Sequence, residues 1–109
     1  MKMPKRSASK ALLDEYIESE SLRLHCEMVA VAMEGYATQL QKSDDIIEQW
    51  WTAGLLHDLD WEKYPDENPK KAVYEILPAH DYDSEIIGAV EAHAPNRTGR
   101  HPENEIERY

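Results

Sequence analysis

The sequence is that of a small, acidic protein of single-domain size. Its 109 residues can form one hydrophobic core but are too few for a catalytic domain together with a separate binding domain. With 22 acidic and 12 basic residues, the formal net charge is −10, which disfavours long nucleic acid because nothing here could neutralise a run of phosphates. A mononucleotide stays compatible, since a bound divalent cation can reverse the field at the site itself.

Cysteine usage and hydropathy indicate where the protein works. The one cysteine, Cys26, rules out a disulfide within the chain and is typical of a reducing compartment. No stretch approaches the roughly 20 apolar residues of a membrane span, and residues 1–10 lack the apolar core of a signal peptide. We therefore expect a cytoplasmic protein without a membrane segment, in which residues 1–10 form a flexible tail and residues 11–109 form one helical domain.

Helices are the elements that the apolar pattern predicts, because the strict alternation of strands is nowhere sustained. The first is a short helix around residues 12–17. A long helix then covers about residues 21–40, and a third, capped by Ser43 or Asp44, covers about residues 45–58.

The second half of the chain is predicted to hold two more helices after a surface connection. Residues 60–69 contain two prolines and cannot continue the third helix. A fourth helix follows over about residues 70–79, and a fifth begins at Asp83 or Ser84 and ends before Pro95. The expected fold is therefore an all-α bundle of about five helices.

Four of the five histidines fall on the apolar faces of these helices. His57, His80 and His93 are each in register with apolar residues of their own helix. A single histidine on such a face is more often a core residue than a ligand, but four in one small interior all need buried partners, which a shared metal ion can supply. The long helix has a predicted core face of Leu22, His25, Met28, Val29, Ala32, Met33, Tyr36 and Leu40.

Asp58 adds a carboxylate next to His57 at the end of the third helix. It continues the apolar stripe through Trp51 and Gly54 and is therefore predicted to point inward. A buried carboxylate needs a cation, a hydrogen-bond network or a raised pKa. The small pair Ala53 and Gly54 lets another helix approach closely, which suits an ion with ligands from two helices.

These residues carry a resemblance to a known family. The stretch Ala53-Gly54-Leu55-Leu56-His57-Asp58-Leu59-Asp60 resembles the HD signature of the HD superfamily, and Leu24-His25 lies where the first histidine of that family belongs. The similarity covers the chain from about Leu22 to its end. It implies a helical domain that binds one or two divalent ions and hydrolyses phosphomonoesters or phosphodiesters.

The resemblance implies that His25, His57 and Asp58 are the ligands of the first metal ion, and that Asp58 also orients or deprotonates the attacking water. His93, in Ala92-His93-Ala94, resembles the histidine that other branches use for a second metal or for substrate. His80 is a weaker candidate for this role, and capping or packing is the favoured interpretation there.

Three further residues near the expected site have two interpretations each. Arg97 and Arg100 either clamp phosphate through their forked donors or belong to a solvated loop. Asp60 begins an acidic loop that is expected to be solvated surface, although it lies close enough to Asp58 to orient a ligand.

The family pattern closes with an aspartate on one more apolar helix, and nothing after His101 offers that helix. Three interpretations follow: a naturally short chain, a fragment of a longer one, or a site that a neighbouring subunit completes. Apolar surface left by a missing helix would favour a homodimer.

The predicted function is metal-dependent hydrolysis of phosphomonoester or phosphodiester bonds in a small, nucleotide-like substrate, with Mn, Fe, Co, Ni, Zn or Mg as the ion. The alternative is a catalytically incomplete HD module that binds a nucleotide or a protein partner without turnover. A di-iron oxygenase is disfavoured, because a full set of six ligands is not recognisable.

Overall fold

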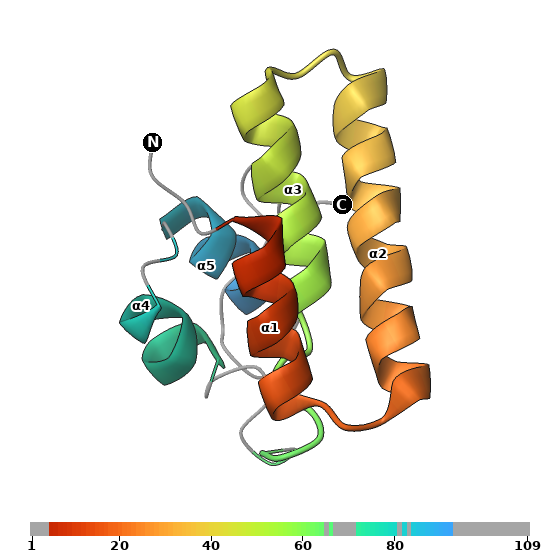
Figure 1. Cartoon of the computed structure of the whole chain (residues 1–109). Helices are drawn as coiled ribbons and strands as arrows, with labels where there is room; N and C mark the ends of the chain where they lie inside the picture. Colours follow the sequence, from red (N-terminus) through yellow and green to blue (C-terminus); the bar gives the residue numbers. More distant parts are fainter. Residues whose placement is uncertain (1–4, 65, 67–71, 81, 83, 93–109) are drawn as a thin grey trace.

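The structure is a computed structural model of the chain and describes residues 5–64, 66, 72–80, 82 and 84–92. No strand occurs among these residues, which confirms the predicted all-α bundle of about five helices (Figure 1). In this described part, no helix is both long and apolar enough to cross a membrane. The elements in chain order are α1 (Arg6–Tyr16), α2 (Glu20–Gln39), α3 (Asp44–Leu56), the π-helix η2 (Ala72–Ile76), α4 (Leu77–Ala79) and α5 (Ser84–Ala92).

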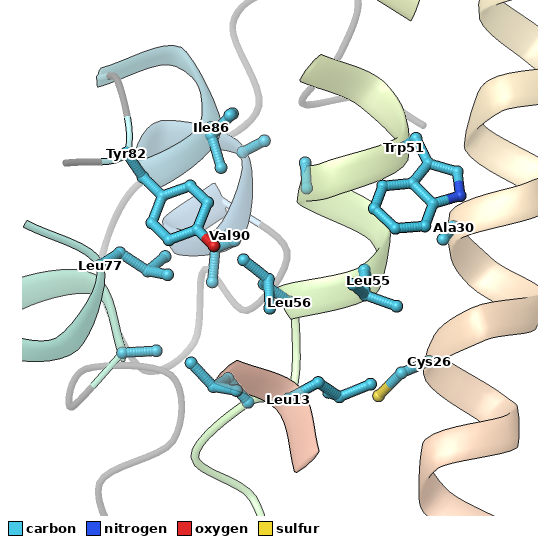
Figure 2. Packing of buried hydrophobic residues seen from close by; sticks show 14 of the residues in the cluster. Leu13, Cys26, Ala30, Trp51, Leu55, Leu56, Leu77, Tyr82, Ile86 and Val90 are labelled. Carbon is cyan, nitrogen blue, oxygen red and sulfur yellow. The ribbon is translucent and has the colours of Figure 1, made fainter. Parts of the chain in front are cut away.

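Helix α3 lies at the centre of the bundle and packs against α1, α2 and α5 (Figure 1). Every residue from Gln49 to Leu56 is buried, as expected for a helix that has neighbours on several sides. Figure 2 shows how apolar side chains from the other helices meet around it, among them Leu13 of α1, Leu77 of α4 and Val90 of α5. This packing holds the C-terminal end of α3 in place. The stretch from Ala53 to Asp60 begins in this last turn of the helix and continues beyond it.

The contact between α2 and α3 is unusually close at Gly54. A Cβ atom placed on Gly54 would lie 2.8 Å from the carbonyl oxygen of Val29 and 3.0 Å from the Cα of Ala30. Real side chains do not approach backbone this closely, so only glycine allows the two helices to meet here. The close approach predicted from the small residues in this stretch is therefore present.

Helix α1 begins at Arg6, well before the start expected from sequence, so the predicted tail of residues 1–10 includes its first turn. Contacts with distant residues explain the difference. The Arg6 guanidinium forms ion pairs with Glu34 and Glu48, and it lies 4.4 Å from the ring centroid of Trp51. Such long-range contacts stabilise a first turn that has no side-chain cap and little apolar character of its own.

The predicted fourth helix is split into η2 and α4 at Leu77. Pro78 is the second residue of α4 and has no N–H with which to bond the preceding turn. A wider π-turn precedes it, and α4 then restarts with proline in its first turn, where a missing donor costs little.

The buried face of α2 differs from the predicted one. Its buried residues are Cys26, Ala30, Met33 and Ala37, while Leu22 and Val29 are partly buried. The prediction was wrong because α2 is apolar around most of its circumference, so the spacing of apolar residues does not select one face. The residues predicted to face the core but exposed in the structure are His25, Met28, Ala32, Tyr36 and Leu40.

Candidate metal centre

His25, His57 and Asp58 come together where the C-terminal end of α3 meets the first half of α2. Each offers one ligand atom, and these atoms all lie within 4.8 Å of one another. His57 is the residue that follows the last turn of α3, and Asp58 continues the turn. The Asp58 carbonyl accepts a hydrogen bond from the Trp61 N–H at 3.0 Å, which tightens the chain just after the helix.

The His57 ring is oriented by the backbone of its own helix. Its Nδ1 lies 2.7 Å from the carbonyl oxygen of Gly54. Since a carbonyl oxygen can only accept, Nδ1 carries a proton, and Nε2 is the ring nitrogen through which His57 can bind a metal ion. The glycine that allows close helix packing thus also supplies the acceptor that directs Nε2 away from the helix.

The spacing of the donors fits one cation. Nε2 of His57 lies 3.1 Å from Oδ2 of Asp58, and two adjacent ligands, each about 2.1 Å from one ion, lie about 3 Å apart. The rings of His25 and His57 have centroids 5.4 Å apart and are tilted by 57°. Two ligand atoms on opposite sides of one ion are about 4.2 Å apart. The three ligand atoms lie within 4.8 Å of one another, so binding one ion requires at most a small side-chain shift.

The centre is open to solvent on the α2 side. The side chains of His57 and Asp58 are 17% and 22% exposed, and His25 is exposed. The expectation that the histidines face the core is therefore wrong for His25 and for His80, which is also exposed. His25 nevertheless reaches the other two ligands, because it lies at the rim of the contact between α2 and α3 rather than inside it.

The comparison with known families agrees with this geometry. The family model described as the HD domain matches residues 23–108, a span that contains all three candidate ligands. The chain belongs to the HD domain family. Membership of this family suggests a metal-dependent phosphohydrolase, and HD domains typically bind divalent metal ions. Two imidazoles with one carboxylate are a donor set that such ions accept. No curated protein and no solved structure matches the chain.

Asp60 holds the turn after Asp58 from the protein interior. It is fully buried rather than solvated, contrary to the prediction for the acidic loop. Its Oδ2 accepts a hydrogen bond from the Ala72 N–H at 3.0 Å, and its carbonyl accepts one from the Tyr64 N–H at 2.8 Å. Asp60 thus joins the turn after Asp58 to the start of η2. Only its place two residues after Asp58 pointed to such a role.

An open groove of about 520 Å³ begins at His25 and runs past the N-terminus of α2. Trp61, a residue that is 46% exposed, contributes its indole side chain. Glu62 closes one side, because its carboxylate accepts hydrogen bonds from the Glu18 N–H at 2.7 Å and the Ser19 N–H at 3.0 Å. These two hydrogen bonds lower the pKa of Glu62, so its charge is kept. The lining residues are Ser19, Ser21, Leu22, His25, Trp61 and Glu62.

Sequence reasoning did not identify this groove, because its walls come from segments far apart in the chain. Of the other predicted site residues, the structure describes only His80. His80 follows the last residue of α4, where its N–H donates to the Leu77 carbonyl at 3.1 Å, and it is not part of the ligand group. His93, Arg97 and Arg100 fall outside the described residues.

Proposed function

We propose that this HD domain binds one divalent cation through His25, His57 and Asp58 and uses it to hydrolyse a phosphate ester of a small organic molecule. The observation that carries the proposal is the meeting of these three donor atoms within 4.8 Å on an open rim of the bundle. A site of this kind offers both ligands for the ion and free positions for water and substrate.

The chemistry divides between the ion and the side chains. A divalent cation bound there lowers the pKa of a coordinated water and polarises a phosphoryl oxygen. His57 is held in the right tautomer by the Gly54 carbonyl. Asp58 provides one oxygen to the ion, and its carboxylate can also accept a proton from the attacking water. The donor set suits Mn, Fe, Co, Ni or Zn better than Mg, which prefers oxygen ligands.

The groove beside His25 indicates which part of the substrate lies where. Among the described residues, its lining includes one carboxylate, Glu62, and no lysine or arginine, which disfavours a second phosphate group at this place. The partly exposed ring of Trp61 and the apolar side chain of Leu22 instead suit an uncharged, flat group such as a nucleobase or an aryl ring. The substrate class that fits is therefore a phosphate ester with one phosphate and a planar organic part.

The proposal is tested by measuring metal content and turnover on the same preparations. We expect the protein to take up about one equivalent of Mn, Co or Zn and to release phosphate from nucleoside monophosphates or aryl phosphates only with metal. Replacing His57 by Ala should remove both properties. His80→Ala is the matched control, because His80 is exposed and lies outside the ligand group.

Two other results would change the conclusion. A protein that takes up no metal at millimolar concentrations would contradict the proposed site. Stoichiometric metal binding together with nucleotide binding, but without phosphate release from any monoester or diester, would favour the module that binds without turnover.

A further inference from the structure

The outer face of α2 carries an exposed apolar stripe that the metal centre does not use. Leu24, Met28 and Val31 are 57%, 62% and 61% exposed, and Gly35 and Thr38 continue the same row. Successive members are four, three, four and three residues apart, the spacing of the seam in paired helices. We call these five residues the α2 stripe.

The α2 stripe lies opposite the face that packs on α3. The buried face is formed by Cys26, Ala30, Met33 and Ala37, about half a turn away around the helix. A helix that is apolar on two opposite faces is normally covered on both. Three large apolar side chains, each more than half exposed and lying in one row, are typical of a protein contact surface.

The order of large and small residues in the α2 stripe indicates the partner. The large side chains, Leu24 and Met28, lie toward the N-terminus, and the small residues, Gly35 and Thr38, lie toward the C-terminus. A Cβ atom added to Gly35 would meet nothing within 4 Å, so the surface above it is open. A second copy of the same helix, turned round, would place large residues over small ones.

We propose that two copies of this chain pair through their α2 stripes in antiparallel orientation, with the two-fold axis near Val31. In this register Leu24 faces Thr38 of the other copy, Met28 lies over Gly35, and Val31 meets Val31. A parallel pair would instead stack Leu24 on Leu24 and leave a gap between the two Gly35 positions. The antiparallel arrangement is therefore the self-complementary one.

Charge does not oppose this contact, although the chain has a net charge of −10. The α2 stripe itself has no charged residue. The acidic side chains beside it, Glu27 and Glu34, are ion-paired with Lys10 at 3.3 Å and with Arg6 of α1. Repulsion between the acidic surfaces elsewhere is screened by salt, so added salt should strengthen the dimer.

Disulfide trapping tests the register. Val31→Cys should form an intermolecular disulfide rapidly under mild oxidation, because the axis brings the two copies of this position together. Leu24→Cys should react at least ten times more slowly, and a mixture of Leu24→Cys with Thr38→Cys should give the heterodimer. Native Cys26 is fully buried and does not compete. Ala79→Cys, an exposed position on α4, is the control for random collision.

Sedimentation velocity tests the association itself. The wild-type chain should be dimeric at tens of micromolar, and Met28→Glu should be monomeric with unchanged helicity, while Ala79→Glu adds the same charge elsewhere and should stay dimeric. Gly35→Leu should weaken the dimer at least tenfold without lowering the melting temperature of the monomer, since the monomer has room for the side chain.

A wild-type chain that is monomeric up to about 100 µM would overturn the proposal. Equal trapping of Leu24→Cys and Val31→Cys would overturn the antiparallel register. Neither result depends on metal or turnover, so the dimer and the proposed phosphohydrolase activity can fail separately.

Discussion

Single residues near the α2–α3 contact determine the geometry of the candidate metal centre. Gly54 orients the ring of His57, and Asp58 brings a carboxylate oxygen within 3.1 Å of the second ring nitrogen, Nε2. The Asp58 side chain is only 22% exposed, so its carboxylate is partly desolvated. Function and stability are therefore expected to respond in opposite directions when Asp58 is changed.

Replacing Asp58 by Ala should lower the metal affinity by at least about 100-fold. In chelator, the same change should leave the free energy of unfolding unchanged or raise it slightly, because a partly desolvated carboxylate is removed. Calorimetric metal titrations and urea melts in chelator measure the two effects. A loss above about 2 kcal/mol in chelator would show that Asp58 is a structural residue instead.

Cys26 should make the fold sensitive to high pH. Burial, followed by the negative charges of Asp58 and Glu27, raises the pKa of its thiol from 9.0 to about 12. The unfolded chain then loses this proton at lower pH than the folded one. The stabilising contribution is therefore complete below about pH 9 and is lost as the pH rises toward 12, by up to about 1.4 kcal/mol per pH unit.

Urea melts of the wild type and Cys26→Ala between pH 7.5 and 10.5, both in chelator, check this. The difference in unfolding free energy between the two proteins should be constant below pH 8.5 and should shift in favour of Cys26→Ala above it. Burial also raises the pKa of Tyr82, but this residue contributes equally to both proteins. A difference that does not depend on pH would contradict the expectation.

Trp61 should determine the affinity for the organic part of the substrate. Replacing it by Leu should raise the KM for a nucleoside monophosphate by about 5- to 150-fold, the range expected for one lost stacking contact, with little effect on kcat. The KM for glycerol phosphate should change little. Ligand binding should also quench the fluorescence of Trp61, because Trp50 and Trp51 are only 2% and 4% exposed. Equal changes in KM for both substrates would contradict stacking.

At the level of elements, the two described glycines of α2 and α3 have opposite surroundings. Gly54 faces the backbone of α2, whereas Gly35 faces open space. Intrinsic helix propensity favours alanine at both positions by about 1 kcal/mol. The packing of the helices therefore decides whether each substitution raises or lowers the free energy of unfolding.

Gly54→Ala should lower the free energy of unfolding by about 1–3 kcal/mol, since its Cβ would lie 2.8 Å from the Val29 carbonyl oxygen. Gly35→Ala should raise it by up to about 1 kcal/mol. Urea melts at submicromolar concentration, where self-association does not contribute, measure both. If both variants were stabilised, the α2–α3 contact would be looser than the structure shows.

At the level of the whole molecule, metal binding should add to the stability of the fold, because the ligands come from both α2 and the end of α3. Metal at 100 times its dissociation constant should contribute about 2.7 kcal/mol, which corresponds to roughly 10 °C or more for a domain of this size. Melting curves with Mn, Co or Zn and with chelator test this. The increase in melting temperature with metal should vanish in Asp58→Ala. This result would distinguish binding at the candidate centre from general cation binding by an acidic protein.

The sequence by itself determined the helical fold class, most helix boundaries and the three candidate ligands. Helix α3 was predicted from a local apolar pattern and begins next to the expected cap, Ser43. The candidate ligands were recognised from the His57-Asp58 stretch and an upstream histidine at the position that the family pattern predicts. Patterns of this kind depend on residues close in the chain, so they can be recognised without knowing how the helices pack.

Only the tertiary structure decided which face of α2 is buried, where α1 begins, and what surrounds the ligands. The burial of Asp60, the groove next to Trp61 and the contacts of Arg6 all join residues distant in sequence. The apolar residues of α2 surround most of the helix, so its pattern allowed several faces equally. The close contact at Gly54 determines which face of α2 packs on α3. It turns Cys26 inward and leaves His25 at the edge of the α2–α3 contact.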